Sequence, residues 1–285
     1  MKIYLDCIPC FIRQALDAAR MATNDESLHE KMLRDILQLT AKMDLFENPP
    51  VIGQHIHRQL RELTGNNDPY AAVKKRFNQM ALDMLPELNA KLSSAEDPFT
   101  AAVRLAITGN IIDFGPKGNI TQDEALEAIV HALSGPFSGD INEFRDELAQ
   151  AKKILYLADN AGEIVFDRLL IEQLLPKDIT LAVRGAPVIN DATLEDAKAA
   201  GLMEVIRIVD NGSDGPGTIL DDCSETFLRL FHEADLIIAK GQGNFETLSD
   251  ANANIFFLFK VKCPVIGAHV GLPTGLQVLL KRQPD

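Results

Sequence analysis

Polar side chains of one chemical kind follow four short apolar runs in the second half of the sequence. Asp159, Asn160 and Glu163 come at and after the end of the first run, "KILYLAD". The residues that follow the next three runs are Arg184, Asn190 and Asp191, then Asp210, Asn211 and Asp214, and finally Lys240, Gln242, Asn244 and Glu246. Carboxylate and amide oxygens without nearby His or Cys suit a hard cation such as Mg²⁺ or Mn²⁺. Because Lys240 and Arg184 add positive charge, the same set would suit a phosphate group.

Ordinary helix caps are the alternative interpretation of these residues. Asp159 or Asn160 could cap a helix that begins near Ala161, and Asp191 could cap the segment "TLEDAKAAG", since Asp and Asn are preferred caps in any protein. A cap needs one acceptor per helix, whereas this chain has Asp-Asn followed by Gly-Glu and later Lys-Gly-x-Gly-Asn-x-Glu. The combined pattern favours a binding site. Asp210 and Asp214 lie in the glycine-rich segment "DNGSDGPGT", and we interpret them as solvated loop residues rather than as part of the binding site.

The apolar runs themselves predict the elements that position these side chains. "KILYLAD", "ITLAVRG", "VIRIVD", "DLIIAKG" and "IFFLFKV" alternate with helix-like segments such as "ETFLRLFHEA". This alternation is typical of a mostly parallel sheet that is covered by helices on both faces. Ligands bind beyond the carboxyl ends of the strands in such a sheet. The polar residues after each run are therefore expected to lie at one edge.

The first part of the chain has a different pattern. Apolar residues recur at helical spacing, as in "PCFIRQALDAARMA", and breaks such as "ENPPVIGQ" divide this part into helices of ordinary length. We therefore predict an all-helical region over residues 1–140 and an α/β domain, which carries the metal and phosphate site, over residues 141–285.

Composition limits the classes of partner. The chain has 285 residues with 28 Lys and Arg against 41 Asp and Glu, a net charge of -13, so nucleic acid is not expected as a partner. Asp6 and Arg13 interrupt the apolar amino terminus, and no run of about 18 apolar residues occurs. We expect a cytoplasmic protein without a membrane partner. The four cysteines are expected to be reduced thiols.

Several motifs in a fixed order resemble those of a known family. "LADNAGEIVFD", "RGAPVINDAT" and "AKGQGNFE", together with the earlier "AITGNIIDFG", resemble the signatures of the DUF89 family, the metal-dependent damage-control phosphatases. The resemblance implies a Rossmann-like three-layer domain after a helical region. It also implies hydrolysis of phosphate esters of small, damaged metabolites, such as sugar phosphates or phosphopantetheine-type compounds, with Mn²⁺, Co²⁺, Ni²⁺ or Mg²⁺ as the cofactor.

The resemblance also implies roles for individual residues. The metal ligands would be Asp159, Asn160 and Asp191. The phosphate and substrate site would be lined by Glu163, Arg184, Asn190, Lys240, Gly241, Gly243, Asn244 and Glu246, with Asn110 and Asp113 reaching it from the helical region. As a hypothesis, metal-activated water attacks the phosphorus, Lys240 neutralises the phosphoryl group, and amides at the start of the helix after Asn160 add donors. Either Glu163 or Glu246 would orient the water as a base.

Two questions stay open on the sequence alone. The "CIPC" segment from Cys7 to Cys10 resembles the short, cysteine-bearing branch of the family, and it can be half of a zinc site, a redox pair or two packed small residues. The alternative function is a non-catalytic module that binds a nucleotide or sugar phosphate. The substrate, the native metal and the oligomeric state are not determined by the sequence.

Overall fold

The computed structural model describes residues 1–109 and 122–282, which form a mixed α/β structure with a seven-stranded sheet. The strand order is β1-β7-β6-β5-β2-β3-β4; β6 and β7 pair antiparallel, and every other neighbouring pair is parallel. The strands are β1 (Phe137–Ser138), β2 (Lys153–Leu157), β3 (Asp178–Val183), β4 (Arg207–Asp210), β5 (Leu236–Lys240), β6 (Ile255–Lys260) and β7 (Gln277–Lys281). The predicted fold class is confirmed.

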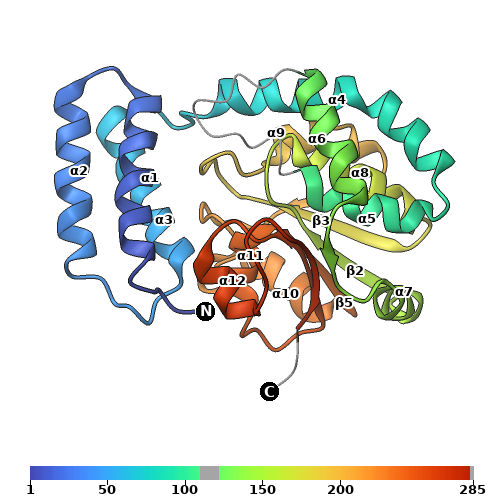
Figure 1. Cartoon of the computed structure of the whole chain (residues 1–285). Coiled ribbons are helices and arrows are strands. Elements are labelled where there is room, and N and C mark those ends of the chain that lie inside the picture. The colour runs from blue at the N-terminus through green and yellow to red at the C-terminus, as the bar shows by residue number, and fades with distance from the viewer. Residues whose placement is uncertain (110–121, 283–285) are drawn as a thin grey trace.

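Helices surround this sheet and extend beyond one end of it (Figure 1). The helices are α1 (Cys7–Ala22), α2 (Glu26–Thr40), α3 (Pro49–Thr64), α4 (Ala71–Ser94), α5 (Pro98–Thr108), α6 (Gln122–Ser134), α7 (Ile141–Gln150), α8 (Glu163–Leu174), α9 (Leu194–Ala199), α10 (Glu225–Glu233), α11 (Gly241–Leu248) and α12 (Pro264–Val270). Local caps account for several starts. The Asp140 carboxylate accepts hydrogen bonds from the first turn of α7, and the Ser224 hydroxyl accepts one from the first turn of α10.

Side-chain alternation along each strand produces two apolar cores, one on each face of the sheet. In β2, Ile154 and Tyr156 point to the face covered by α4, α5 and α8, whereas Leu155 and Leu157 point to the face covered by α10, α11 and α12. Figure 1 shows the two groups of helices above and below the sheet. The domain therefore has three layers, and both faces of the central strands are buried.

The helices of the first 140 residues fall into two groups. α1, α2 and α3 form a bundle with its own core, which includes Phe11, Met32, Ile36 and Ile56 (blue in Figure 1). α4, α5 and α6 instead pack into the core on one face of the sheet. β1 also lies within this part of the chain and pairs with β7. The division of the chain at residue 140 stays a prediction.

The strand order changes direction next to β2, which decides where a ligand can bind. After β2 the chain adds β3 and β4 on one side and then returns to place β5 on the other side. At such a switch point the connections leave in opposite directions and open a crevice at the carboxyl ends of the two strands. Asp159 follows β2 and Lys240 ends β5, so the crevice lies beside the predicted site.

Candidate active site

The loops after β2 and β3 are joined by backbone hydrogen bonds. Asn160 and Asp191 form an isolated antiparallel bridge. The Ala161 N–H donates to the Asn190 carbonyl oxygen at 2.8 Å, and the Ala192 N–H donates to the Asp159 carbonyl oxygen at 2.8 Å. Because the two loops are fixed to each other, the side chains of Asp159, Asn160 and Asp191 are brought together, with 7%, 5% and 4% exposure.

Hydrogen bonds set the orientation of the Asn160 amide. Its Nδ2 donates to Asp159 Oδ2 at 2.8 Å and to Glu163 Oε2 at 3.1 Å. Since both of these bonds use the nitrogen, the amide oxygen Oδ1 is the atom that Asn160 can offer to a cation. Glu163 is itself held in place, because its Oε1 accepts a hydrogen bond from Lys240 Nζ at 2.7 Å. Asn160 is therefore oriented by a chain of buried polar groups.

Lys240 lies on the interior side of Asn160 and Glu163, and among the described residues its side chain contacts only other buried groups. Its Nζ donates to Glu163 Oε1, to Asp167 Oδ1 at 2.6 Å and to the Ala106 carbonyl oxygen at 2.6 Å. The Lys240 side chain is fully buried, and its three N–H groups match these three acceptors. Burial raises the pKa of Asp167 to about 6, against the opposing effect of Lys240. The sequence predicted a phosphate contact for Lys240, whereas the structure places it among carboxylates.

Arg184 links the two carboxylates of the site. Its Nε donates to Asp191 Oδ2 at 2.6 Å, and its Nη2 lies 3.9 Å from Asp159 Oδ1. That Nη2 is buried, and no atom of the described residues forms a hydrogen bond with it. Burial raises the pKa of Asp159 well above its ordinary value, and the nearby charges of Glu163 and Asp191 add to the effect. Burial also raises the pKa of Asp191, although Arg184 opposes this shift.

The start of α11 fits closely against Asp159. Gly241 has φ +80°, and a Cβ at this position would lie 1.9 Å from Asp159 Oδ2. Only glycine can therefore occupy position 241 without displacing the carboxylate. Asn244 is fully buried and joins α11 to the ends of β2 and β5. Its Nδ2 donates to the Ala158 carbonyl oxygen at 3.2 Å and to the Lys240 carbonyl oxygen at 2.6 Å. Its Oδ1 accepts a hydrogen bond from the Thr218 hydroxyl at 2.8 Å.

A cavity of about 610 Å³ opens in front of these residues. The predicted site residues that border it are Asp159, Asn160, Asn190, Asp191, Gly243 and Glu246. Gln242 Nε2 donates to Glu246 Oε1 at 2.9 Å, yet burial raises the pKa of Glu246 to about 7.

The other predicted site residues do not border this cavity. Glu163, Arg184, Lys240, Gly241 and Asn244 lie outside its lining. Of these, Glu163, Arg184 and Gly241 contact residues that line it, namely Asn160, Asp191 and Asp159. Asn110 and Asp113 lie outside the described residues.

The two backbone amides just before α8 donate hydrogen bonds within the protein. The Gly162 N–H donates to Asn78 Oδ1 at 2.7 Å, and the Ala161 N–H is used by Asn190. Gly162 has φ +77°, and a Cβ there would lie 3.0 Å from the Cβ of Phe77. These two amides are therefore engaged within the protein. The start of α11 borders the cavity instead, through Gln242 and Gly243.

Three residues of the site were missed by the sequence analysis. Asp167 lies one helical turn after Glu163, and this spacing on α8 was a usable signal. Asn78 comes from α4, and no feature of the sequence marks it as a partner of Gly162. Ile189 has φ +46°, an unusual conformation for a β-branched residue, immediately before Asn190. Its side chain packs against the core of the α1–α3 bundle, which anchors the loop that carries Asp191.

The donor set can be compared with what a metal ion requires. Within the described ranges, no group of three or more His, Cys, Asp or Glu side chains is arranged to hold a metal ion. The oxygen donors that border the cavity here are the carboxylates of Asp159 and Asp191 and the amide of Asn160. Such an all-oxygen set is typical of hard divalent cations.

Comparison with known proteins identifies the family. The sequence matches the model of the damage-control phosphatase ARMT1-like domain over residues 3–278. The protein belongs to this family. A damage-control phosphatase of Pyrococcus horikoshii is 35% identical over 291 residues, 99% of either chain. One of Archaeoglobus fulgidus is 34% identical, covering 96% of this chain and 97% of the relative. The structure of a DUF89 family protein of P. horikoshii superposes with a TM-score of 0.91 at 34% identity, covering 99% of this chain and 100% of the other.

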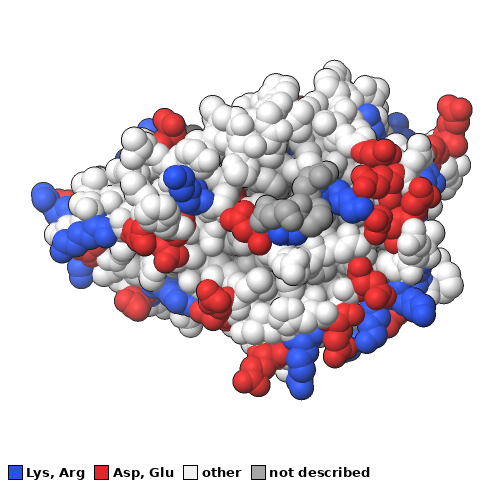
Figure 2. All heavy atoms as spheres, turned by 90° about the horizontal axis from the view of Figure 1, so that it is seen from below, with Lys and Arg blue, Asp and Glu red and all other residues white. Residues whose placement is uncertain are grey.

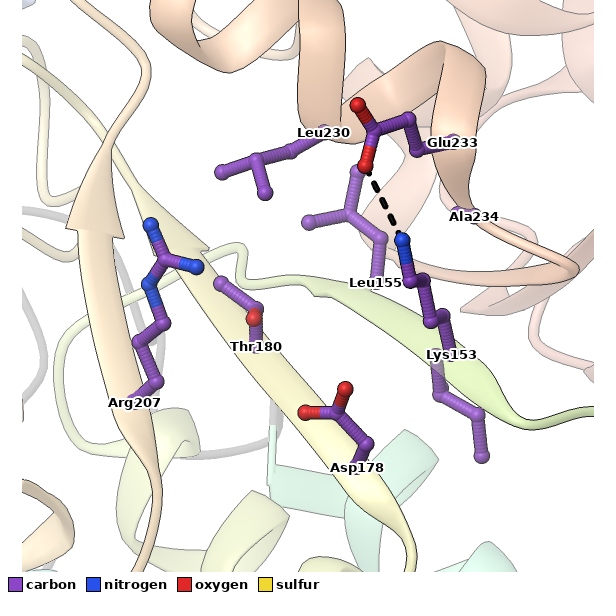
Figure 3. Close-up of a pocket in the computed structure, with 9 residues that line it drawn as sticks. Lys153, Leu155, Asp178, Thr180, Arg207, Leu230, Glu233 and Ala234 are labelled. Carbon is purple, nitrogen blue, oxygen red and sulfur yellow. Dashed lines mark hydrogen bonds and ion pairs between the residues drawn. The ribbon is translucent and has the colours of Figure 1, made fainter.

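Other hollows in the surface of this damage-control phosphatase family member lie away from the cavity. A small cavity of about 100 Å³ lies at the opposite end of the strands, where Lys153 pairs with Glu233 near Asp178 and Arg207 (Figure 3). Figure 2 shows acidic and basic side chains interspersed over one face, without a continuous basic area. Among the described residues, no helix has the length and apolar character needed to cross a membrane.

Proposed function

We propose that the protein is a metal-dependent phosphomonoesterase that hydrolyses phosphate esters of small, damaged metabolites. Asp159, Asn160 and Asp191 would hold Mg²⁺, Mn²⁺, Co²⁺ or Ni²⁺. One observation carries the proposal: these three oxygen-bearing side chains lie on bridged loops at neighbouring strand ends and border one cavity of about 610 Å³. The names of the relatives support the same activity.

The charge of the buried cluster supports a divalent cation. Four buried carboxylates, of Asp159, Glu163, Asp167 and Asp191, lie against two buried cationic side chains, of Arg184 and Lys240. With all four ionised, the cluster has an excess of two negative charges, which is costly in a buried environment unless protonation, which the raised pKa of Asp159 favours, or a bound cation compensates it. A bound divalent cation would polarise a phosphoryl oxygen and lower the pKa of a water molecule.

The chain's own residues would perform the remaining steps. Glu246 borders the cavity and has a pKa of about 7, so its carboxylate can accept a proton from an attacking water near neutral pH. Glu163 has both oxygens engaged by Asn160 and Lys240, and we therefore assign it to positioning Asn160. The first-turn N–H groups of α11, which borders the cavity, would bind phosphate oxygens.

Metal-resolved kinetics with a matched pair of variants tests this function. Phosphate release from p-nitrophenyl phosphate and from sugar phosphates is measured with Mn²⁺, Co²⁺, Ni²⁺ or Mg²⁺ added singly. Asp191→Asn is expected to lower kcat/KM by at least about 100-fold and to weaken Mn²⁺ binding in calorimetry. Asp178→Asn is the control, because Asp178 begins β3 at the opposite end of the sheet. Binding of phosphate esters with no turnover under any metal would instead favour a non-catalytic module.

A further inference from the structure

The cavity extends from the acidic residues to a wall that the α/β domain does not build alone. The apolar members of this wall are Cys7, Cys10 and Phe11 of α1, Pro50 of α3, and Cys263 and Val265 at the start of α12, and Asp6, Gln14 and Lys262 line the cavity beside them. We call the six apolar members the apolar wall. α3 also contacts α11, the helix that begins beside Asp159. The bundle of α1–α3 is therefore placed to touch the part of a ligand that lies beyond its phosphate.

Cys7 and Cys10 contribute protonated thiols to this wall. Partial burial raises the pKa of Cys7 and of Cys10 above the ordinary value for a thiol. A protonated thiol is a weak hydrogen-bond donor and packs as a small apolar group. The thiols therefore add to the apolar surface of Phe11, Pro50 and Val265.

The size of the cavity shows how much of a ligand this wall can contact. The cavity has about 610 Å³, whereas a phosphate group fills on the order of three to four water volumes, about 100 Å³. Most of the space is therefore left for the organic part of an ester. Cavities of this volume accept whole small-molecule ligands.

We propose that the apolar wall is the leaving-group subsite of the enzyme and that it selects phosphate monoesters whose organic part presents an apolar face. This proposal rests on the phosphatase function proposed above. A polyhydroxylated leaving group would lose hydrogen bonds to water against the six wall residues. An alkyl or aryl group gains free energy by leaving water there. The residues of α1, α3 and α12 thus determine specificity, while the loops after β2 and β3 carry the chemistry.

A homologous series of substrates tests the subsite. kcat/KM with Mn²⁺ is measured for ethyl, butyl and hexyl phosphate, whose bonds to phosphorus are chemically alike. Each buried methylene is expected to raise kcat/KM by about fourfold, which gives about 250-fold from ethyl to hexyl. In parallel, the affinities of the matching alkylphosphonates, which are not hydrolysed, are measured by calorimetry.

Neutral polar substitutions in the wall provide the matched variants. Cys10→Asn on α1 and Val265→Asn on α12, both at positions that line the cavity, are each expected to lower kcat/KM for hexyl phosphate about tenfold and to leave ethyl phosphate unchanged. Leu37→Asn, at a position of α2 that is 46% exposed and outside the cavity lining, is the control.

The two proposals fail in different ways. A flat wild-type series, or wall variants that behave as Leu37→Asn does, would overturn the subsite while leaving phosphatase activity in place. Absence of turnover with every metal, combined with phosphonate affinities that rise with chain length, would overturn the phosphatase function and support the subsite.

Discussion

Replacing Lys240 by methionine tests whether this residue supports the site from behind or contacts the phosphate. Methionine keeps much of the side-chain volume and removes the charge and three donors. Glu163 and Asp167 would then lose their cationic partner inside a fully buried environment. Removing one partner of a buried ion pair costs about 3–5 kcal/mol. Because Lys240 serves two carboxylates and the Ala106 carbonyl, we expect about 4 kcal/mol at pH 8.

The loss of stability in Lys240→Met should be larger at high pH than at low pH. Without Lys240, the folded state raises the pKa of Asp167 further above its unfolded value, since burial opposes ionisation and the opposing effect of Lys240 is lost. The folded state then binds more protons than the unfolded state, so stability falls as pH rises. The pKa of Asp167 is about 6 even with Lys240 present. The variant should therefore be destabilised less at pH 5 than at pH 8.

Urea unfolding followed by circular dichroism at both pH values measures the effect. Lys153→Met is the matched control, because Lys153 pairs with Glu233 at 3.0 Å but the two side chains are 57% and 60% exposed. No measurable change is expected there, since solvent screens such a pair. A triple variant, Lys240→Met with Glu163→Gln and Asp167→Asn, should recover most of the lost stability because it leaves no unpaired charge.

If Lys240→Met unfolds at the wild-type urea concentration and binds Mn²⁺ normally but loses kcat/KM, then Lys240 acts on the phosphoryl group and its buried ion pairs are not structural. Our expectation is the reverse, namely lower stability together with weaker Mn²⁺ binding, because Glu163 would no longer hold Asn160.

Three further predictions follow from the same geometry. If Glu246 is the base, kcat of the wild type rises with pH up to about 7, and Glu246→Gln loses this rise together with about 100-fold in kcat. Because the raised pKa means that ionisation of Glu246 destabilises the folded state, Glu246→Gln should also raise Tm more at pH 8 than at pH 5. A wild-type kcat that does not change from pH 5 to 8 would count against Glu246 as the base. Gly241→Ala should abolish Mn²⁺ binding in calorimetry, because its Cβ would meet the Asp159 carboxylate. The control Gly271→Ala, at φ +70° with no atom within 4 Å of its Cβ, should cost only about 1 kcal/mol in urea unfolding and leave Mn²⁺ binding unchanged. Equal Mn²⁺ affinities of the two variants would contradict the steric argument. Asn78→Ala should lower stability by about 1–3 kcal/mol, because the Gly162 N–H and Asp196 lose a buried partner, and an unchanged urea midpoint would show that this contact is dispensable.

The sequence by itself determined the fold class and the edge of the sheet where polar residues gather. Short apolar runs alternating with helical segments specify a covered parallel sheet, because each strand must bury both faces. The ends of such strands converge, and this is why Asp159 and Asp191 could be placed together from two separate motifs. The β-bridge between Asn160, the neighbour of Asp159, and Asp191 agrees with that expectation. Their metal-binding role stays a proposal.

Only the tertiary structure decided what each polar side chain faces. Lys240 ends a strand as predicted, yet its side chain turns away from the cavity toward Glu163 and Asp167, a direction set by helices far away in the chain. In the same way, Cys7 and Cys10 lie some 250 residues before Cys263, and all three meet at one wall. Local periodicity determines elements and their order, whereas the contacts between distant elements depend on how their apolar faces pack. Those contacts separate the residues that border the cavity from the residues that hold them in place.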